Sequence, residues 1–308
     1  MVGGLWQSLA VIVIAQEILD AQAEGRAVVA LESTIIAHGL PYPENVALAG
    51  QLESEIRACG AVPATIAILE GKACVGLSAA QLERLASPKS TIKKAGAADV
   101  GVAIAKGDDA ATTVSGTSAL AARAGIRFFA TGGIGDVHPA VSADLLSLSR
   151  EPVAVISAGP KAILDLPRTM EALESLSVLV LGYKTNELPA FYSRESGLRL
   201  EHRVDSPQIA AAALHARWQL LGQGGALIAN PAPEDVALPM ATVAAWIAEA
   251  SAAANEQGVS GKALTPFLLQ FLANISGGEA VATNCALARN NAMVAAQIAV
   301  AYSELARA

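Results

Sequence analysis

The sequence predicts a three-layer α/β/α fold around a central, mixed and largely buried sheet. Short runs of β-branched and other apolar residues alternate along the chain with longer helical patterns, and such alternation is typical of layered α/β domains. Several of the short runs, including residues 28–31 and 226–229, are apolar throughout. Strands of that kind are covered on both faces, so we expect helices on either side of the sheet.

Eight segments carry the strand pattern, and the turn between two of them indicates the type of sheet. They are residues 28–31, 64–69, 74–77, 111–114, 127–131, 153–157, 178–181 and 226–229. Glu70-Gly71 lies between the second and the third, and a glycine in such a short connection favours an antiparallel hairpin. The sheet should therefore contain antiparallel as well as parallel pairs.

Six further segments carry a helical pattern. They are residues 45–59, 79–85, 118–124, 207–219, 238–257 and 280–306. Ser78 precedes the second of them and is a plausible N-cap, because its hydroxyl can accept a hydrogen bond from a free amide of the first turn. Sites in α/β sheets form where strands end and helices begin, so the residues that follow each strand are the first candidates.

Composition favours a single cytoplasmic domain that spans residues 1–308. Hydrophobic residues make up 53% of the chain, enough for buried layers, and the net charge of −7 argues against general binding of nucleic acid. Three widely separated cysteines give neither a disulfide framework nor a C-x-x-C metal motif. The apolar run 9–15 is too short to span a membrane and lacks the basic flank of a signal peptide, so it should begin a helix or a strand.

The first candidate for chemistry is Glu32, which follows directly on the apolar strand 28–31. A carboxylate at that position is poorly solvated and suits the transfer of protons near neutrality. A helix-capping or ion-paired glutamate is the alternative interpretation.

The second candidate is Lys161, which the segment Ala158-Gly159-Pro160 presents after the apolar strand 153–157. A lysine in a site of low dielectric constant can act as a Schiff-base nucleophile, whereas a phosphate-pairing or surface lysine is the alternative.

A glycine-rich turn and an acidic segment follow the strand 127–131. Thr131 leads into Gly-Gly-x-Gly, whose amide groups could approach a phosphate, although such a turn can equally be a tight connection. Asp144 in Ser142-Ala143-Asp144 could bind a hard metal ion through water or cap the helix that follows. Polar islands elsewhere have ordinary surface explanations as well. They are Lys93-Lys94, residues 111–117, Asn284 and Asn290-Asn291.

Taken together, these segments resemble the pseudouridine-5′-phosphate glycosidase family, also called pseudouridylate synthases or indigoidine synthase A-like proteins. The resemblance covers nearly the whole chain, from about residue 27 to residue 302. It rests on the ordered stretches ALESTIIAHGLPYPEN, GAVPATIAILEGKACVGLS, ATTVSGT, FATGGIG, SADL, AGPKAILDLPRT, GYKTNELPAFYSR, RVDSP, NPAPE, TPFLL and NCALARNNA.

The resemblance implies a reaction and a set of residues. It implies reversible cleavage of pseudouridine 5′-phosphate to uracil and ribose 5-phosphate, with Lys161 as the Schiff-base nucleophile at C1′ and Glu32 as the proton donor and acceptor. Asp144 would hold a manganese ion through waters. The positions expected around the sugar, base or phosphate are Lys94, Thr113, Thr131, His138, Ser142 and Asn284. The family also implies a homotrimer, with no nucleic-acid or membrane partner.

Two departures from the family pattern bear on the substrate. The family carries Lys-x-Ser-Arg-Arg-Asp-Leu where residues 94–100 read Lys-Ala-Gly-Ala-Ala-Asp-Val, so two arginines are absent. The loop between His138 and Ser142 is also shortened, to Pro139-Ala140-Val141. The altered loop supports one alternative, a C-glycosynthase or glycosidase that acts on another aglycone. A non-catalytic protein that binds a sugar phosphate is a further alternative, and the presence of both Lys161 and Glu32 argues against it.

Overall fold

An eleven-stranded sheet forms the centre of the computed structural model, which describes residues 12–137, 140–161, 165–260 and 264–307. Within these residues the strand order is β1-β4-β3-β2-β7-β8-β11-β9-β10, and β6 pairs with both β3 and β5. The strands are β1 Ile12–Ile14, β2 Val28–Leu31, β3 Val62–Leu69, β4 Lys72–Val75, β5 Lys93–Ala95, β6 Ala110–Thr112, β7 Phe128–Ala130, β8 Ala154–Ser157, β9 Leu179–Tyr183, β10 His202–Val204 and β11 Ala226–Ala229.

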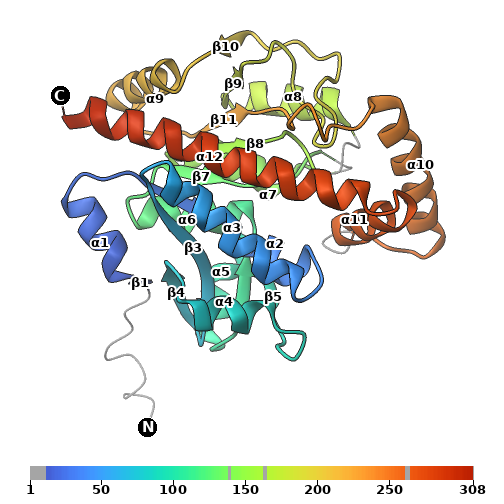
Figure 1. The fold of residues 1–308 in the computed structure, drawn as a ribbon, viewed down its shortest axis with the longest axis horizontal. Helices are drawn as coiled ribbons and strands as arrows, with labels where there is room; N and C mark the ends of the chain where they lie inside the picture. Colours follow the sequence, from blue (N-terminus) through green and yellow to red (C-terminus); the bar gives the residue numbers. More distant parts are fainter. Residues whose placement is uncertain (1–11, 138–139, 162–164, 261–263, 308) are drawn as a thin grey trace.

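Helices cover both faces of the sheet, which confirms the predicted three-layer fold (Figure 1). They are α1 Gln16–Ala23, α2 Thr34–His38, α3 Glu44–Ala58, α4 Ala79–Ala86, α5 Val100–Ala105, α6 Val114–Arg123, α7 Ala143–Arg150, α8 Leu166–Ser175, α9 Pro207–Leu221, α10 Met240–Glu256, α11 Leu264–Ile275 and α12 Glu279–Arg307, with a 3-10 turn at Ala97–Asp99. None of these described helices is long and apolar enough to cross a membrane.

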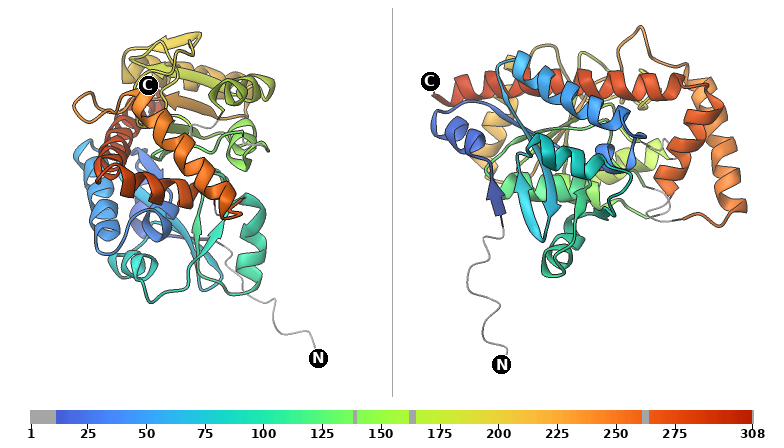
Figure 2. Two further views of the ribbon diagram at one scale, coloured as in Figure 1. Left: turned by 90° about the vertical axis from the view of Figure 1, so that its right-hand side faces the viewer. Right: turned by 60° about the horizontal axis from the view of Figure 1, so that its bottom comes forward.

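The fully buried strand β2 shows how the side chains divide between the two layers. Val29 and Leu31 pack into the cluster that includes α3, α9 and α12, whereas Val28 and Ala30 pack into the cluster with α1, α6 and α7. Successive residues of a strand point to opposite faces, so an apolar run without interruption is required when both faces are covered. The longest helix, α12, crosses the sheet, and α10 and α11 lie together beside its first turns (Figures 1 and 2).

The sheet is mixed, as the sequence predicts. β3 pairs with β4 and with β6 in antiparallel fashion, and the other described pairs are parallel. The turn Glu70-Gly71, in which both residues have positive φ, joins Leu69 directly to its partner Lys72. Because this turn has only two residues, β4 begins at Lys72, two residues before its predicted start. The strand ends at Val75.

Several boundaries and elements differ from the prediction. The predicted strand 111–114 ends at Thr112, because the side chain of Thr113 caps α6, which begins four residues earlier than expected. Ser78 caps α4 as predicted and forms a capping box with Gln81. The apolar run 9–15, expected to begin a helix or a strand, contains β1, and the helix expected after Asp144 is α7. The pattern missed the short strands β5 and β10 and the helices α1, α2, α5, α8 and α11.

Candidate active site

A cavity of about 500 Å³ lies where β2, β7 and β8 end. These three parallel neighbours present their carboxyl ends at the same edge of the sheet, which is where sites in α/β proteins form. Seven of the predicted site residues line this cavity: Glu32, Lys94, Thr113, Ser142, Asp144, Lys161 and Asn284. Thr131 contacts one of them directly, and His138 lies outside the described residues.

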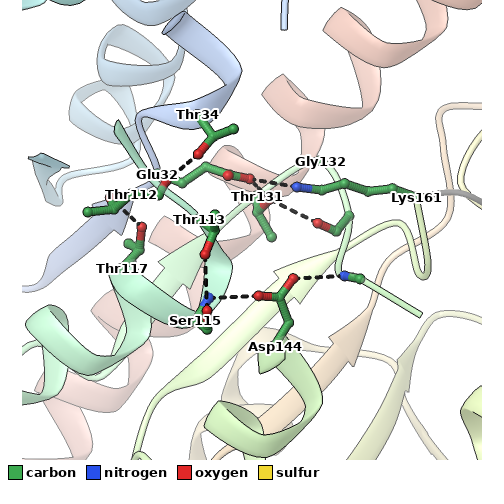
Figure 3. A network of polar contacts seen from close by, with 12 residues as sticks. Glu32, Thr34, Thr112, Thr113, Ser115, Thr117, Thr131, Gly132, Asp144 and Lys161 are labelled. Atoms are coloured by element: carbon green, nitrogen blue, oxygen red, sulfur yellow. Dashed lines mark hydrogen bonds and ion pairs between the residues drawn. The ribbon is translucent and has the colours of Figure 1, made fainter. Parts of the chain in front are cut away.

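The centre of the cavity is a contact between a lysine and a buried carboxylate (Figure 3). Nζ of Lys161 lies 3.1 Å from Oε1 of Glu32, and the two side chains are 21% and 3% exposed. The hydroxyl of Thr131 donates a second hydrogen bond to the same oxygen. Oε2 of Glu32 is buried and has no hydrogen-bond partner in the described part of the chain. One carboxylate oxygen is therefore held by two hydrogen bonds, and the other is buried without a hydrogen bond among the described residues.

The turn after β8 delivers Lys161 into the cavity. The amide of Ala158 donates to the carbonyl of Gly132 (2.9 Å), and the amide of Lys161 donates to that of Ile134 (2.8 Å), so the segments after β7 and β8 run side by side. Gly159 has φ +88°, and a Cβ atom there would lie 2.0 Å from the carbonyl oxygen of Pro189. Only glycine fits this position, which explains the Ala-Gly-Pro sequence before the lysine.

The glycine-rich turn after β7 is closely packed. A Cβ atom on Gly133 would lie 2.8 Å from the ring of Phe191 and 2.7 Å from the carbonyl oxygen of Gly159. The amide of Gly135 donates to Oδ2 of Asp144 at 2.9 Å. Of the two interpretations that the sequence left open, these contacts support the tight connection.

Asp144 ties this turn to the start of α6. Its Oδ1 accepts the amide hydrogen of Ser115 at 2.8 Å, while its Oδ2 accepts that of Gly135. The N-cap of α7 is Ser142, whose hydroxyl accepts from the amide of Asp144 at 3.2 Å. Asp144 therefore does not cap the helix that follows it, one of the two alternatives for this residue, because its carboxylate accepts amides from the first turn of α6 and from the turn after β7 instead.

The described residues offer no cluster for direct coordination of a metal ion. They contain no group of three or more histidine, cysteine, aspartate or glutamate side chains that could coordinate one directly. Each oxygen of Asp144 already accepts one amide, and a carboxylate oxygen has a further lone pair. This donor set suits a hard cation held through water rather than a direct coordination shell.

The other polar residues of the cavity come from β5 and from helix starts. β5 alternates, so Lys93 points outward and pairs with Asp108 at 2.6 Å, whereas Lys94 lines the cavity. Thr113 is the N-cap of α6, and its hydroxyl lies 3.0 Å from that of Ser115. Hydroxyl, amide and ammonium donors thus gather around one space.

The prediction missed His38, which ends α2 and lines the same cavity. Burial is the largest cause that lowers the pKa of this imidazole below 6.5, and the charge of Lys94 lowers it further, while a hydrogen bond with the backbone of Lys93 raises it. His38 stands in the segment Ala30 to Gly39 that drew attention to Glu32. The sequence carries a signal for His38, because this residue lies in the short helix that directly follows a predicted strand, where sites in α/β sheets form.

A buried carboxylate beside a lysine at the carboxyl ends of parallel strands defines an α/β enzyme. A sequence profile of the family described as "Indigoidine synthase A like protein" matches residues 17–301, so the chain belongs to that family.

Similar proteins agree with this assignment. A pseudouridine-5′-phosphate glycosidase of Chloroflexus aurantiacus is 51% identical, over 95% of this chain and 99% of that protein. The protein of the same name from Caldanaerobacter subterraneus is 49% identical, over 95% and 97%. The crystal structure of the prealnumycin C-glycosynthase AlnA in complex with ribulose 5-phosphate is 40% identical, with a TM-score of 0.89 over 97% of this chain and 99% of AlnA.

Proposed function

We propose that the enzyme catalyses the reversible cleavage of pseudouridine 5′-phosphate to uracil and ribose 5-phosphate. The contact between Lys161 and Glu32 in the cavity carries this proposal, because a C-glycoside needs both an amine and a proton carrier. The relatives named pseudouridine-5′-phosphate glycosidase support the choice of substrate. The similarity to AlnA, whose structure is in complex with ribulose 5-phosphate, supports a five-carbon sugar phosphate as the other ligand.

The chemistry of the bond explains the residue types. The leaving atom of an O- or N-glycoside can be protonated on a heteroatom, and paired carboxylates suffice for that purpose. A C-glycoside lacks such a heteroatom between sugar and base. The bond between C1′ and C5 of uracil can break only if C5 receives a proton and if an electron pair becomes available at C1′. A neutral amine bonded to C1′ supplies that electron pair.

In the proposed sequence Glu32 first accepts a proton from Lys161, which lies within hydrogen-bond distance. The free amine then forms a bond to C1′ as the bond between C1′ and O4′ breaks, and O4′ takes up the proton that the attacking amine loses, which leaves a neutral amine on C1′ and a hydroxyl at O4′. Glu32 then returns a proton to C5, the bond between C1′ and C5 breaks, and the nitrogen lone pair forms a C1′=N iminium. Water hydrolyses the iminium to ribose 5-phosphate and restores the lysine, so one water is consumed for each uracil released.

The polar rim of the cavity suits the binding and orientation of the sugar phosphate. We assign this role to Lys94, Thr113, Ser142 and Asn284, all of which line the cavity. Lys94 supplies a positive charge, and the hydroxyls and the amide supply neutral hydrogen bonds. His138, assigned to the substrate by resemblance, stays a prediction.

We also propose that Asp144 holds a manganese ion through water molecules. Such an ion would supply positive charge that orients the base or its bound waters. The expected homotrimer and cytoplasmic location stay predictions.

The test is the synthetic direction of the reaction. Purified protein is incubated with manganese, uracil and ribose 5-phosphate, and pseudouridine 5′-phosphate is detected by chromatography. We expect a product with the wild type and with Lys89→Ala, an exposed-loop control, and none with Lys161→Ala. Borohydride should trap ribose 5-phosphate on Lys161. Turnover by Lys161→Ala near that of the wild type would contradict the mechanism.

A second candidate function is the formation or cleavage of a C-glycoside with a different aglycone. Two observations favour it: the similarity to AlnA, and the small side chains of Ala97 and Ala98 in the cavity wall. These two residues stand where the family pattern carries arginines. A folded protein that makes no pseudouridine 5′-phosphate, but whose Lys161 is still trapped with ribose 5-phosphate, would favour this candidate.

A further inference from the structure

A fully buried amide on α12 holds the turn behind the catalytic pair. The side chain of Asn291 has no exposed surface. Its Nδ2 donates to the carbonyl oxygen of Thr131 at 2.8 Å and to that of Gly132 at 3.3 Å. Its Oδ1 accepts a hydrogen bond from Nδ2 of Asn230 at 2.8 Å. These three bonds use both donor hydrogens and one acceptor site of the amide.

Asn230 anchors this amide to the sheet. It follows β11 directly, and its backbone amide donates to the carbonyl oxygen of Ser157 at the end of β8 (2.9 Å). β8 lies between β7 and β11 in the sheet. Through Asn291, α12 therefore joins the carboxyl ends of β7 and β11 across β8, at the edge of the sheet where the cavity lies.

The chain of contacts ends on Glu32. Asn291 fixes the carbonyl group of Thr131, and the hydroxyl of the same Thr131 donates to Oε1 of Glu32. Asn291 itself does not line the cavity, so it acts on the reaction only through another residue. Packing alone does not require an asparagine at this position, because an apolar side chain fills buried space without the cost of burying an amide.

The same helix face also carries a cavity residue. Asn284 precedes Asn291 by seven residues, which is two helical turns, so both side chains point to the same side of α12. A Cβ atom on Gly132 would lie 3.3 Å from Oδ1 of Asn284. The bonds that Asn291 makes to Thr131 and Gly132 therefore also fix the position of Asn284 relative to the turn.

We propose that Asn291, oriented by Asn230, is a positioning residue for proton transfer by Glu32. The inference rests on the proposed function, in which Glu32 carries a proton to and from the substrate. Asn291 holds Thr131, and Thr131 keeps Oε1 of Glu32 directed at Lys161. Loss of the two donors should slow the chemical step and leave the binding of the sugar phosphate nearly unchanged.

The test compares Asn291→Leu, which keeps the number and branching of the side-chain heavy atoms and removes the donors, with Asn290→Leu on the same helix. The amide of Asn290 bonds to the carbonyl of Pro231 and not to the turn after β7. We expect Asn291→Leu to lower kcat about 100-fold, the loss typical of a misplacement of about 1 Å. KM for ribose 5-phosphate should change less than about threefold, and Asn290→Leu should keep kcat within about threefold of the wild type.

A double-mutant cycle separates positioning from general damage to the fold. If Asn291 acts through Thr131, Asn291→Leu should lower kcat by less than about threefold in a Thr131→Val background. If the double variant loses kcat by the product of the two single fold-losses, the two residues act independently and the proposal is overturned. If Asn291→Leu does not fold, Asn230→Leu replaces it and should lower kcat in the same direction by about tenfold, because the orienting donor is lost. An unchanged kcat in that variant would also overturn the proposal.

A substrate-independent measurement distinguishes failure of this inference from failure of the proposed function. A crystal structure of Asn291→Leu, or of Asn230→Leu, should show the hydroxyl of Thr131 more than 3.5 Å from Oε1 of Glu32, beyond hydrogen-bond distance. If the wild type makes no pseudouridine 5′-phosphate but this bond breaks in the variant, the proposed function fails and the positioning role stands. If the bond persists in the variant, the positioning role fails whatever the substrate.

Discussion

Nζ of Lys161 lies 3.1 Å from Oε1 of Glu32, although 129 positions separate the two residues in the chain. The strands β2 and β8, whose ends carry these residues, both pair with β7. The parallel register of three short strands is thus what brings an amine and a carboxylate together. Their different exposure, 21% and 3%, suits the proposed mechanism, in which the amine reaches a substrate and the carboxylate exchanges protons away from bulk water.

Glu32→Gln should abolish most of the turnover without loss of substrate binding. A glutamine keeps the shape of the side chain but cannot accept a proton from Lys161 or return one to the base. General acid–base groups typically contribute about 10²–10⁴-fold, so kcat should fall by at least about 100-fold. Steady-state kinetics with ribose 5-phosphate as the varied substrate measures kcat, which should fall, and KM, which should stay nearly unchanged. Glu24→Gln, on an exposed carboxylate that pairs with Arg26, is the control, and more than a tenth of the wild-type kcat in Glu32→Gln would contradict the assignment.

Gly159→Ala should destabilise the protein more than Gly60→Ala does. Both glycines have similar positive φ values, +88° and +85°, but only a Cβ atom on Gly159 meets another atom, the carbonyl oxygen of Pro189 at 2.0 Å. Conformational strain alone costs about 1–2 kcal/mol, and the clash adds to it, so we expect a loss of about 3 kcal/mol at Gly159 and about 1 kcal/mol at Gly60. Urea denaturation measures both. Equal losses would show that the turn before Lys161 can relax around the added atom.

Strands buried on both faces could be predicted from the sequence, and short strands with polar side chains could not. Residues 28–31 and 226–229 form strands with the predicted bounds, because strands buried on both faces leave a continuous apolar run. β5 reads Lys-Lys-Ala, and only its pairing with β6 makes it a strand. Lys93, which pairs with Asp108, is charged, so this segment has no continuous apolar run that would predict a strand.

The sequence indicated the site residues but not the contacts that hold them. Glu32 and Lys161 were recognised because each follows an apolar strand. The hydrogen bond from Thr131 to Glu32 depends on the neighbouring positions of β2 and β7, which strand patterns do not reveal. Asn291 was visible only as a polar residue on an apolar helix, and its role needs the tertiary contact with Thr131. These contacts join segments that are far apart in the chain, so local sequence patterns could not predict them.

His38 should make the protein less stable in mild acid. Burial, as the largest cause, lowers the pKa of His38 below 6.5 in the folded state. Between its lowered pKa and about 6.5 the unfolded chain binds more protons than the folded one, so the free energy of unfolding must fall as the pH falls through this window. His38→Gln removes this proton uptake, and its urea midpoint should depend less on pH between 7.5 and 5.5. His202→Gln, on an exposed histidine, should behave as the wild type, and an equal slope in all three proteins would contradict the prediction.

Asp144→Asn should lower the stability whether or not manganese is present. The carboxylate accepts one amide hydrogen on each oxygen, from Ser115 and from Gly135. An asparagine amide has only one oxygen, so its NH2 group must face one of these two donors and leave it unsatisfied. A buried donor without a partner costs about 1–3 kcal/mol.

Thermal denaturation in EDTA and in manganese separates this structural role of Asp144 from metal binding. We expect a lower Tm for Asp144→Asn in EDTA, with no change for Asp235→Asn, an exposed control. If Asp144 also holds the ion through water, manganese should raise the Tm of the wild type and of Asp235→Asn, and raise that of Asp144→Asn much less, since ligands stabilise the state that binds them. A wild-type Tm in EDTA for Asp144→Asn would contradict the structural role. An equal response of all three proteins to manganese would contradict the metal site, because the ion would then bind elsewhere.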